Sequence, residues 1–208
     1  MTEPDGKVTL QEYWNLRAAK YNVEDIFGRR LLKAYIEKNQ LHPRSVVDIG
    51  TGPGELLHLF QDVPRVVGLD FSPAMLERAH RRVERHGWKN VELIEQDLTK
   101  RHLDEKFELL IGRTVLMHID PDHIEKAVEN CIAMSDTIMI LELWEETEGN
   151  NPELLRPSLG QWTPAGRKLA SHNWIHDYHG LFESKGYRTM EAYRRPDLPQ
   201  VLFVFKRR

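Results

Sequence analysis

Apolar side chains over the first forty residues recur at helical spacing, and strand-like runs begin only after them. Thr9 and Glu12 match a capping box, and aromatic and aliphatic residues follow every three or four positions. We predict one helix over residues 10–21 and another over 24–39. Because both precede the first strand, residues 1–40 are interpreted as an N-terminal helical cap.

Five short runs rich in β-branched residues then alternate with helical segments. Ser72 and Pro73 provide an N-cap and an N1 proline for one of these helices, and Gly87 ends it. The other two helices are expected over 55–61 and from Asp120 onward. Alternation of this kind predicts right-handed βαβ units and a parallel sheet. The predicted strands are 45–49, 65–70, 91–95, 107–111 and 137–143.

The last quarter of the chain follows a different pattern. Residues 145–173 show no clear periodicity, and a helix is predicted over 174–185. Two strand-like runs follow, at 187–193 and 201–205. Seven residues join them, which is too few for a helical crossover, so the pair should be antiparallel. The predicted architecture is a doubly wound, mostly parallel α/β sheet that ends in an antiparallel hairpin.

Length and composition indicate one domain with no basic bias. The chain has 208 residues with a net charge of −3, which argues against a protein that mainly neutralises phosphate backbones. We divide the single domain 1–208 into the cap, a core over 44–143, a segment over 144–180 and a hairpin over 187–206. We expect no nucleic-acid partner, and either a monomer or a homodimer.

Neither the apolar runs of the chain nor its first residues indicate a membrane span or secretion. The longest purely apolar run has five residues, whereas a membrane-spanning helix needs roughly 20. The first residues are polar and resemble no targeting signal. Cys131 is the only cysteine, which excludes an intramolecular disulfide and a Cys-rich zinc site and fits a cytoplasmic protein.

The segment from Asp48 to Gly54 lies at the end of the first predicted strand and contains three glycines. Glycines there let a backbone approach a ligand closely. Asp70 ends the second strand, where a carboxylate can accept hydrogen bonds from both hydroxyls of a ribose. A nicotinamide site requires G-x-G-x-x-G, but here the third glycine comes one residue early and Glu55 occupies its place. The pattern alone leaves the cofactor open.

Four motifs in order make the chain similar to the class I S-adenosylmethionine-dependent methyltransferases of small molecules. They are Asp48-Ile-Gly-Thr-Gly-Pro-Gly54, Gly68-Leu-Asp-Phe-Ser-Pro-Ala-Met75, Glu95-Gln-Asp-Leu98 and Phe107-Glu-Leu-Leu-Ile-Gly-Arg-Thr-Val-Leu-Met-His-Ile119. The resemblance covers residues 10–143, and the terminal hairpin fits the Rossmann-like seven-stranded sheet of that family.

The resemblance implies a role for each matching residue. Glycines of the first motif make room for the methionine part and ribose of S-adenosylmethionine, and Asp70 holds the ribose hydroxyls. Residues of the second and third motifs contact the adenine. The N-terminal helix covers the cofactor in similar enzymes, so a cation on it or after strand four can reach the cofactor carboxylate. The implied cofactor-binding residues are Tyr13, Arg17, Asp48, Gly50, Gly52, Gly54, Asp70, Phe71, Met75, Gln96, Asp97, Leu98 and Arg113.

Three side chains are candidates for a general base. His118 follows strand four, Glu142 ends strand five, and His176 lies in a segment rich in histidine and aromatic residues. An imidazole is suited to accepting a proton from a hydroxyl near neutral pH. If the last helix extends back far enough, His172 and His176 share a face, which would permit a divalent metal, but no metal site is predicted because magnesium prefers carboxylates. The candidate substrate-binding residues are Trp144, His172, Trp174 and Tyr178.

These features predict methyl transfer to a small polar molecule, with S-adenosylhomocysteine as the second product. A hydroxyl of a sugar or natural product is favoured because several candidate bases are present. N-methylation of a small amine is one alternative, and a non-catalytic S-adenosylmethionine-binding protein is another. The segment Gly112 to Val115 lacks the acid or Asn followed by two prolines of amino-methylating nucleic-acid enzymes. Cys131 is expected on the apolar face of a helix, so it is not assigned as a nucleophile.

Overall fold

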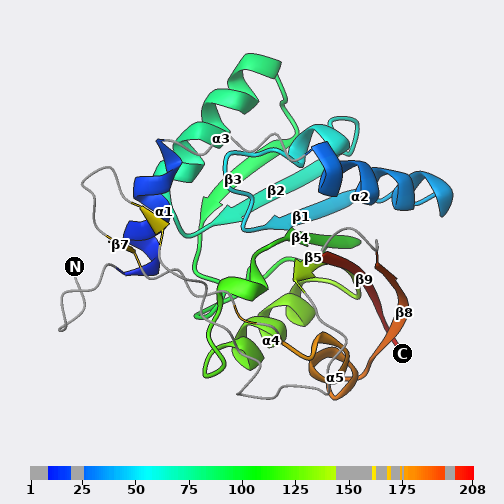
Figure 1. Ribbon diagram of the computed structural model, residues 1–208. Coiled ribbons are helices and arrows are strands. Elements are labelled where there is room, and N and C mark those ends of the chain that lie inside the picture. Colours follow the sequence, from blue (N-terminus) through cyan, green and yellow to red (C-terminus); the bar gives the residue numbers. More distant parts are fainter. Residues whose placement is uncertain are drawn as a thin grey trace.

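The computed structural model describes residues 9–19, 26–143, 161–162, 168–169, 174, 176–194 and 200–208. Its centre is a twisted seven-stranded sheet (Figure 1). The strands are β1 (Ser45–Ile49), β2 (Arg65–Asp70), β3 (Val91–Glu95), β4 (Leu109–Arg113), β5 (Thr137–Leu143), β8 (Tyr187–Arg194) and β9 (Gln200–Arg207). A separate two-stranded pair consists of β6 (Gln161–Trp162) and β7 (Lys168–Leu169).

The strand order confirms the predicted architecture. It runs β3-β2-β1-β4-β5-β9-β8, with β1 to β5 parallel and β9 antiparallel to both neighbours. The chain therefore crosses over between β3 and β4, which places the carboxyl ends of β1 and β4 side by side at the switch point. Ligands of open α/β sheets bind at this point.

Helices cover both faces of the sheet. They are α1 (Leu10–Ala18), α2 (Ile26–Lys38), α3 (Pro73–His86), α4 (Ile124–Met134) and α5 (Tyr178–Glu183), with 3-10 turns η1 (Leu57–Phe60) and η2 (Leu116–His118). One apolar core joins α4 and α5 to alternate residues of the strands, such as Val47 and Val67. The other joins α2 and η1 to the opposite set, such as Val46 and Val66. Figure 1 shows α2 on one side of the sheet and α4 and α5 on the other.

Local signals set several boundaries as predicted. Ser72 caps α3 by accepting a hydrogen bond from the backbone N–H of Met75, Pro73 is its first residue, and Gly87 ends it with a φ of 68°. At the start of α1, Thr9 and Glu12 form both halves of the capping box. These caps are encoded within four residues of the helix ends, which is why the sequence predicts them well.

Other boundaries differ from the prediction. Strand β4 starts at Leu109 because the N–H of Glu108 bonds the hydroxyl of Ser45 instead. Helix α4 starts at Ile124 and not at Asp120. The side chain of Asp120 accepts the N–H groups of Asp122 and His123, which form a turn before the helix. The helix expected over 55–61 is only the 3-10 turn η1.

The last helix is also shorter than predicted. Helix α5 starts at Tyr178, and Asp177 caps it by accepting the N–H of Gly180. His176 thus precedes the helix, so the condition under which His172 and His176 would share a face is not met at His176. His172 lies outside the described residues.

Candidate functional site

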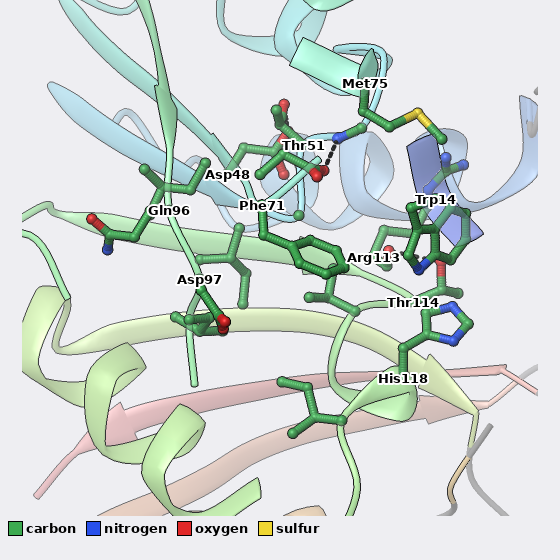
Figure 2. A pocket seen from close by; sticks show the side chains of 18 of the residues that line it. Trp14, Asp48, Thr51, Phe71, Met75, Gln96, Asp97, Arg113, Thr114 and His118 are labelled. Carbon is green, nitrogen blue, oxygen red and sulfur yellow. Dashed lines mark hydrogen bonds between the residues drawn. The ribbon is translucent and has the colours of Figure 1, made fainter. Parts of the chain in front are cut away.

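A cavity opens at the carboxyl ends of β1, β2 and β4, beneath α1 (Figure 2). It encloses about 1030 Å³ that no protein atom fills, including its open mouth. Concave sites of this kind, at the switch point of an open α/β sheet, are where small molecules bind. Its wall includes members of all four sequence motifs: Asp48, Gly50, Gly52, Asp70, Phe71, Met75, Gln96, Asp97, Leu98, Arg113 and His118.

Gly50 and Gly52 of the glycine loop after β1 line the cavity, whereas Gly54, which is also predicted to contact the cofactor, is not among the lining residues. Gly50, Gly52 and Gly54 have φ values of 58°, 55° and 75°, a region that favours glycine. At Gly50 a β-carbon would lie 2.4 Å from a methyl group of Val115, so this glycine also lets the loop after β4 pack closely. At Gly52 a β-carbon would meet no protein atom nearer than 4.0 Å. Since Gly52 is part of the wall, its missing side chain leaves space for a ligand.

Asp70 is fixed at the end of β2 by two backbone donors. Its Oδ2 accepts the N–H of Gly52 and its Oδ1 accepts the N–H of Ser72, each at 2.8 Å. Burial raises the pKa of Asp70 to about 6, although these N–H groups oppose the shift. The remaining lone pairs of this carboxylate are available to two adjacent hydroxyls, as a ribose offers.

Asp48 lies deeper, with 1 % of its surface exposed. Its Oδ2 accepts a hydrogen bond of 2.7 Å from the hydroxyl of Thr51. Burial raises the pKa of Asp48 to about 7. The side chain thus braces the glycine loop from below, as well as forming part of the cavity wall.

The residues predicted at the adenine end gather along one side. Figure 2 shows Gln96 and Asp97 together, with the ring of Phe71 between them and His118. Asp97 accepts the N–H and hydroxyl of Thr99 at 2.9 and 2.6 Å and pairs with Lys100 at 2.9 Å. Burial raises its pKa, but these contacts outweigh burial and lower it overall. Asp97 is therefore both a turn former and a charged group on the wall.

Arg113 is part of an ion pair that the sequence reasoning missed. Its guanidinium lies 2.7 Å from the carboxylate of Glu55, and the two side chains are 10 % and 16 % exposed. Both line the cavity. The sequence offered one signal, an acid directly after the last glycine, but nothing local shows that it meets a residue 58 positions away.

Helix α1 covers the cavity, but with other side chains than predicted. Of the residues that the structure describes in α1, Leu10 and Trp14 line the wall, whereas Tyr13 and Arg17 do not. Tyr13 is 2 % exposed, and Arg17 donates to its hydroxyl at 3.1 Å while lying 5.5 Å from its ring. The two residues pack within the roof and are not among those that line the cavity, so their contact with the cofactor stays a prediction.

Polar contacts hold α1 in place over α3. Asn15 accepts from the hydroxyl of Ser72 at 2.6 Å, and the amide of Gln11 donates to the carbonyl of Phe71 at 2.5 Å. Arg78 on α3 donates to the carbonyl of Ala18. The roof is thereby attached to the segment that carries Asp70 and Phe71.

Of the three candidate bases, only His118 lines the cavity. It ends η2, and its ring lies edge-on to Trp14 with 5.0 Å between ring centroids. The two rings lie side by side in Figure 2. Thr114, at the start of the same loop, has a φ of 53°, a conformation that is rare for a β-branched residue.

Glu142 and His176 are buried behind the cavity wall, at 0 % and 2 % exposure. Glu142 accepts the N–H groups of residues 115–117, and His176 bonds the carbonyl of Ile119 at 2.9 Å. Neither side chain is among the residues that line the cavity, so their role as bases stays a prediction that this position does not support.

The predicted substrate-binding residues are only partly described. Trp144 and His172 lie outside the described residues. Trp174 donates its backbone N–H to the carbonyl of Met117 at 2.6 Å. Tyr178 is fully buried and packs against Phe203. It is not among the residues that line the cavity, although the sequence predicts that it contacts the substrate.

Among the residues that the structure describes, no group of three or more His, Cys, Asp or Glu side chains could hold a metal ion. None of the described helices is both long enough and apolar enough to span a membrane.

The fold and the cavity together define an α/β protein with a cavity at its sheet switch point, and comparisons with known proteins refine this class. Residues 46–135, from β1 to the end of α4, match the family described as Methyltransferase domain. No curated protein matches the chain.

Several solved structures share the fold. The DhpI–SAH complex is 18 % identical, with 95 % of this chain and 94 % of that chain covered and a TM-score of 0.71. Magnesium protoporphyrin IX methyltransferase from Synechocystis PCC 6803 is 17 % identical, with 98 % and 90 % covered and a TM-score of 0.65. The 1,6-didemethyltoxoflavin-N1-methyltransferase of Burkholderia thailandensis is 15 % identical, with 100 % and 93 % covered and a TM-score of 0.64. The family match thus covers the part of the chain from β1 to α4, and the solved structures show that the chain shares their fold.

Proposed function

We propose that the chain binds S-adenosylmethionine in this cavity and transfers its methyl group to a hydroxyl of a small molecule. Asp70 holds the ribose hydroxyls, and the adenine lies toward Phe71 and Asp97. The glycine loop and the Glu55–Arg113 pair meet the methionine part, where Arg113 faces its carboxylate and Glu55 its ammonium group. The three similar structures named above are a complex with SAH and two methyltransferases, which supports this use of the fold.

The reaction is an in-line displacement at the methyl carbon. A lone pair of the acceptor oxygen forms the new C–O bond while the C–S⁺ bond breaks and its electrons return to sulfur. S-adenosylhomocysteine leaves as a neutral thioether, and the hydroxyl proton passes to the imidazole of His118. Since the leaving group is already good, alignment and exclusion of water supply much of the rate.

One observation carries the choice of His118. It lines the same cavity as Asp70, beside Trp14 of the covering helix. This arrangement gives the acceptor an apolar roof and a nearby proton acceptor. A base is of most use to a hydroxyl, which must lose its proton as it is methylated.

N-methylation of a small amine is the second candidate. The Burkholderia thailandensis structure is named as an N1-methyltransferase, which shows that this fold accommodates a nitrogen acceptor. An unprotonated amine needs little help from a base, so this candidate predicts a weak dependence on His118. We also propose that the protein is cytoplasmic and is a monomer or a homodimer.

Formation of S-adenosylhomocysteine should be measured with phenols, sugars and amines on the wild type, His118→Gln and His80→Gln. His80 is an exposed histidine of α3 and serves as a matched control. We expect turnover with a hydroxyl acceptor that falls about 100-fold or more in His118→Gln and is unchanged in His80→Gln. Turnover with amines alone, insensitive to His118, would favour the second candidate.

A further inference from the structure

The loop that carries His118 is held by side chains from distant parts of the chain. Oε1 of Glu142, at the end of β5, accepts the N–H groups of Val115 and Leu116, both at 2.9 Å. Its Oε2 accepts the N–H of Met117 at 3.2 Å. One carboxylate thus receives three consecutive backbone donors directly before His118.

The carbonyl groups of the same loop are held from the other side. The Nε2 of His176 lies 2.9 Å from the carbonyl oxygen of Ile119. The backbone N–H of Trp174 donates to the carbonyl of Met117 at 2.6 Å. Both partners come from the segment before α5, so this segment and β5 together fix the loop from Val115 to Ile119.

The loop also begins in a strained conformation. Thr114 has a φ of 53°, and its hydroxyl donates to the carbonyl of Arg113 at 2.7 Å. A β-branched residue keeps such a conformation only where the surrounding structure enforces it. Thr114 lines the cavity, so the strain lies at the wall itself.

Because Glu142 and His176 are buried, each needs hydrogen-bond partners within the protein. Glu142 is 0 % exposed and His176 is 2 % exposed. A buried carboxylate without donors is strongly unfavourable, and here the three N–H groups satisfy it. Burial raises the pKa of Glu142 to about 7 against these donors. Burial, together with the charge of the nearby Glu142, raises the pKa of Cys131 and of Tyr178.

We propose that Glu142 and His176 are positioning residues, which hold the loop so that His118 faces the acceptor beside Trp14. The proposal rests on the proposed function, in which His118 accepts the proton. It assigns a purpose to two groups that line no part of the cavity. It also predicts that their effect on turnover passes through His118.

The test is a double-mutant cycle between Glu142→Gln and His118→Gln. The glutamine keeps one oxygen but turns an NH₂ group toward backbone donors, so the loop should shift. We expect kcat to fall between about tenfold and a hundredfold, while the Kd for S-adenosylhomocysteine changes less than about threefold. The double variant should be no slower than His118→Gln alone, because a mispositioned base and a missing base have the same result.

Hydrogen exchange provides a readout independent of turnover. Amides of residues 115–117 should exchange faster in Glu142→Gln than in the wild type, and those of β1 should not. Glu183→Gln is the matched control, since Glu183 is an exposed glutamate that accepts from Thr189. If Glu142→Gln does not fold, His176→Gln tests the same loop from the carbonyl side.

Three results would overturn the proposal: wild-type kcat in folded Glu142→Gln, multiplicative effects in the cycle, or equal loss of kcat and cofactor affinity. Failure of the proposed function looks different. In that case His118→Gln keeps full activity, while exchange at residues 115–117 still reports whether Glu142 holds the loop.

Discussion

Replacement of Gly52 by alanine separates the cost of backbone strain from the loss of ligand space. Gly52 has a φ of 55°, and its β-carbon would meet no protein atom nearer than 4.0 Å. The added methyl group therefore enters the cavity without a clash in the folded protein. Gly87, at the end of α3, has a φ of 68° and no atom within 4 Å of an added β-carbon. It provides a matched control away from the cavity.

The two substitutions should cost similar stability but differ in ligand binding. An alanine in the left-handed region costs roughly 1–2 kcal/mol of unfolding free energy, so both variants should be destabilised by that amount. A methyl group forced into a fitted site costs about 1–3 kcal/mol more. Only Gly52→Ala should thus bind S-adenosylmethionine more weakly, by about 5-fold to 150-fold.

Equilibrium dialysis with labelled S-adenosylmethionine measures the affinity, and thermal unfolding measures the stability. Wild-type affinity in Gly52→Ala would refute the assignment of this space to the cofactor. An equal loss of affinity in Gly87→Ala would show instead that general destabilisation, and not the cavity, controls binding.

Three further predictions follow from buried groups. Asp70 must be ionised to accept two hydroxyls, so cofactor affinity should be constant above its pKa of about 6 and weaken by up to about tenfold per pH unit below it, as calorimetry at several pH values would show. Burial raises the pKa of Asp48 from 3.8 to about 7, so its contribution to stability is complete below pH 3.8 and is lost as the pH rises through about 7. Asp48→Asn should therefore flatten the fall in unfolding free energy between pH 4 and 7 in urea titrations, whereas Asp136→Asn, at an exposed acid, should not. Burial also raises the pKa of the Cys131 thiol, which is 0 % exposed, so a thiol reagent should label it only in denaturant; rapid labelling of the native protein would contradict this burial.

Features encoded over a few residues were predicted well. The capping box at Thr9 and the Ser72–Pro73 start of α3 depend on neighbouring groups alone. The alternation of strands and helices, followed by a hairpin, fixed the sheet architecture because connections of this kind have few allowed topologies. The glycine loop and Asp70 lie at the ends of β1 and β2, where the pattern predicts them.

Roles that depend on distant partners were not predicted. A glutamate at the end of a strand reads equally well as a base or as a buried acceptor. The three N–H groups that Glu142 accepts lie 25 to 27 positions earlier in the chain. The Glu55–Arg113 pair spans 58 positions. Such contacts exist only once the strands are ordered, so residue type and local spacing cannot specify them.

The central claim is that this cavity holds the cofactor through Asp70. Titration calorimetry with S-adenosylhomocysteine should compare the wild type, Asp70→Asn and Asp136→Asn. The control removes the same charge from an exposed acid that pairs with Arg207. Loss of charged hydrogen bonds worth about 1.5–3 kcal/mol predicts that only Asp70→Asn weakens binding, by about 10-fold to 150-fold. No binding to folded wild type, or equal affinity in all three proteins, would contradict the claim.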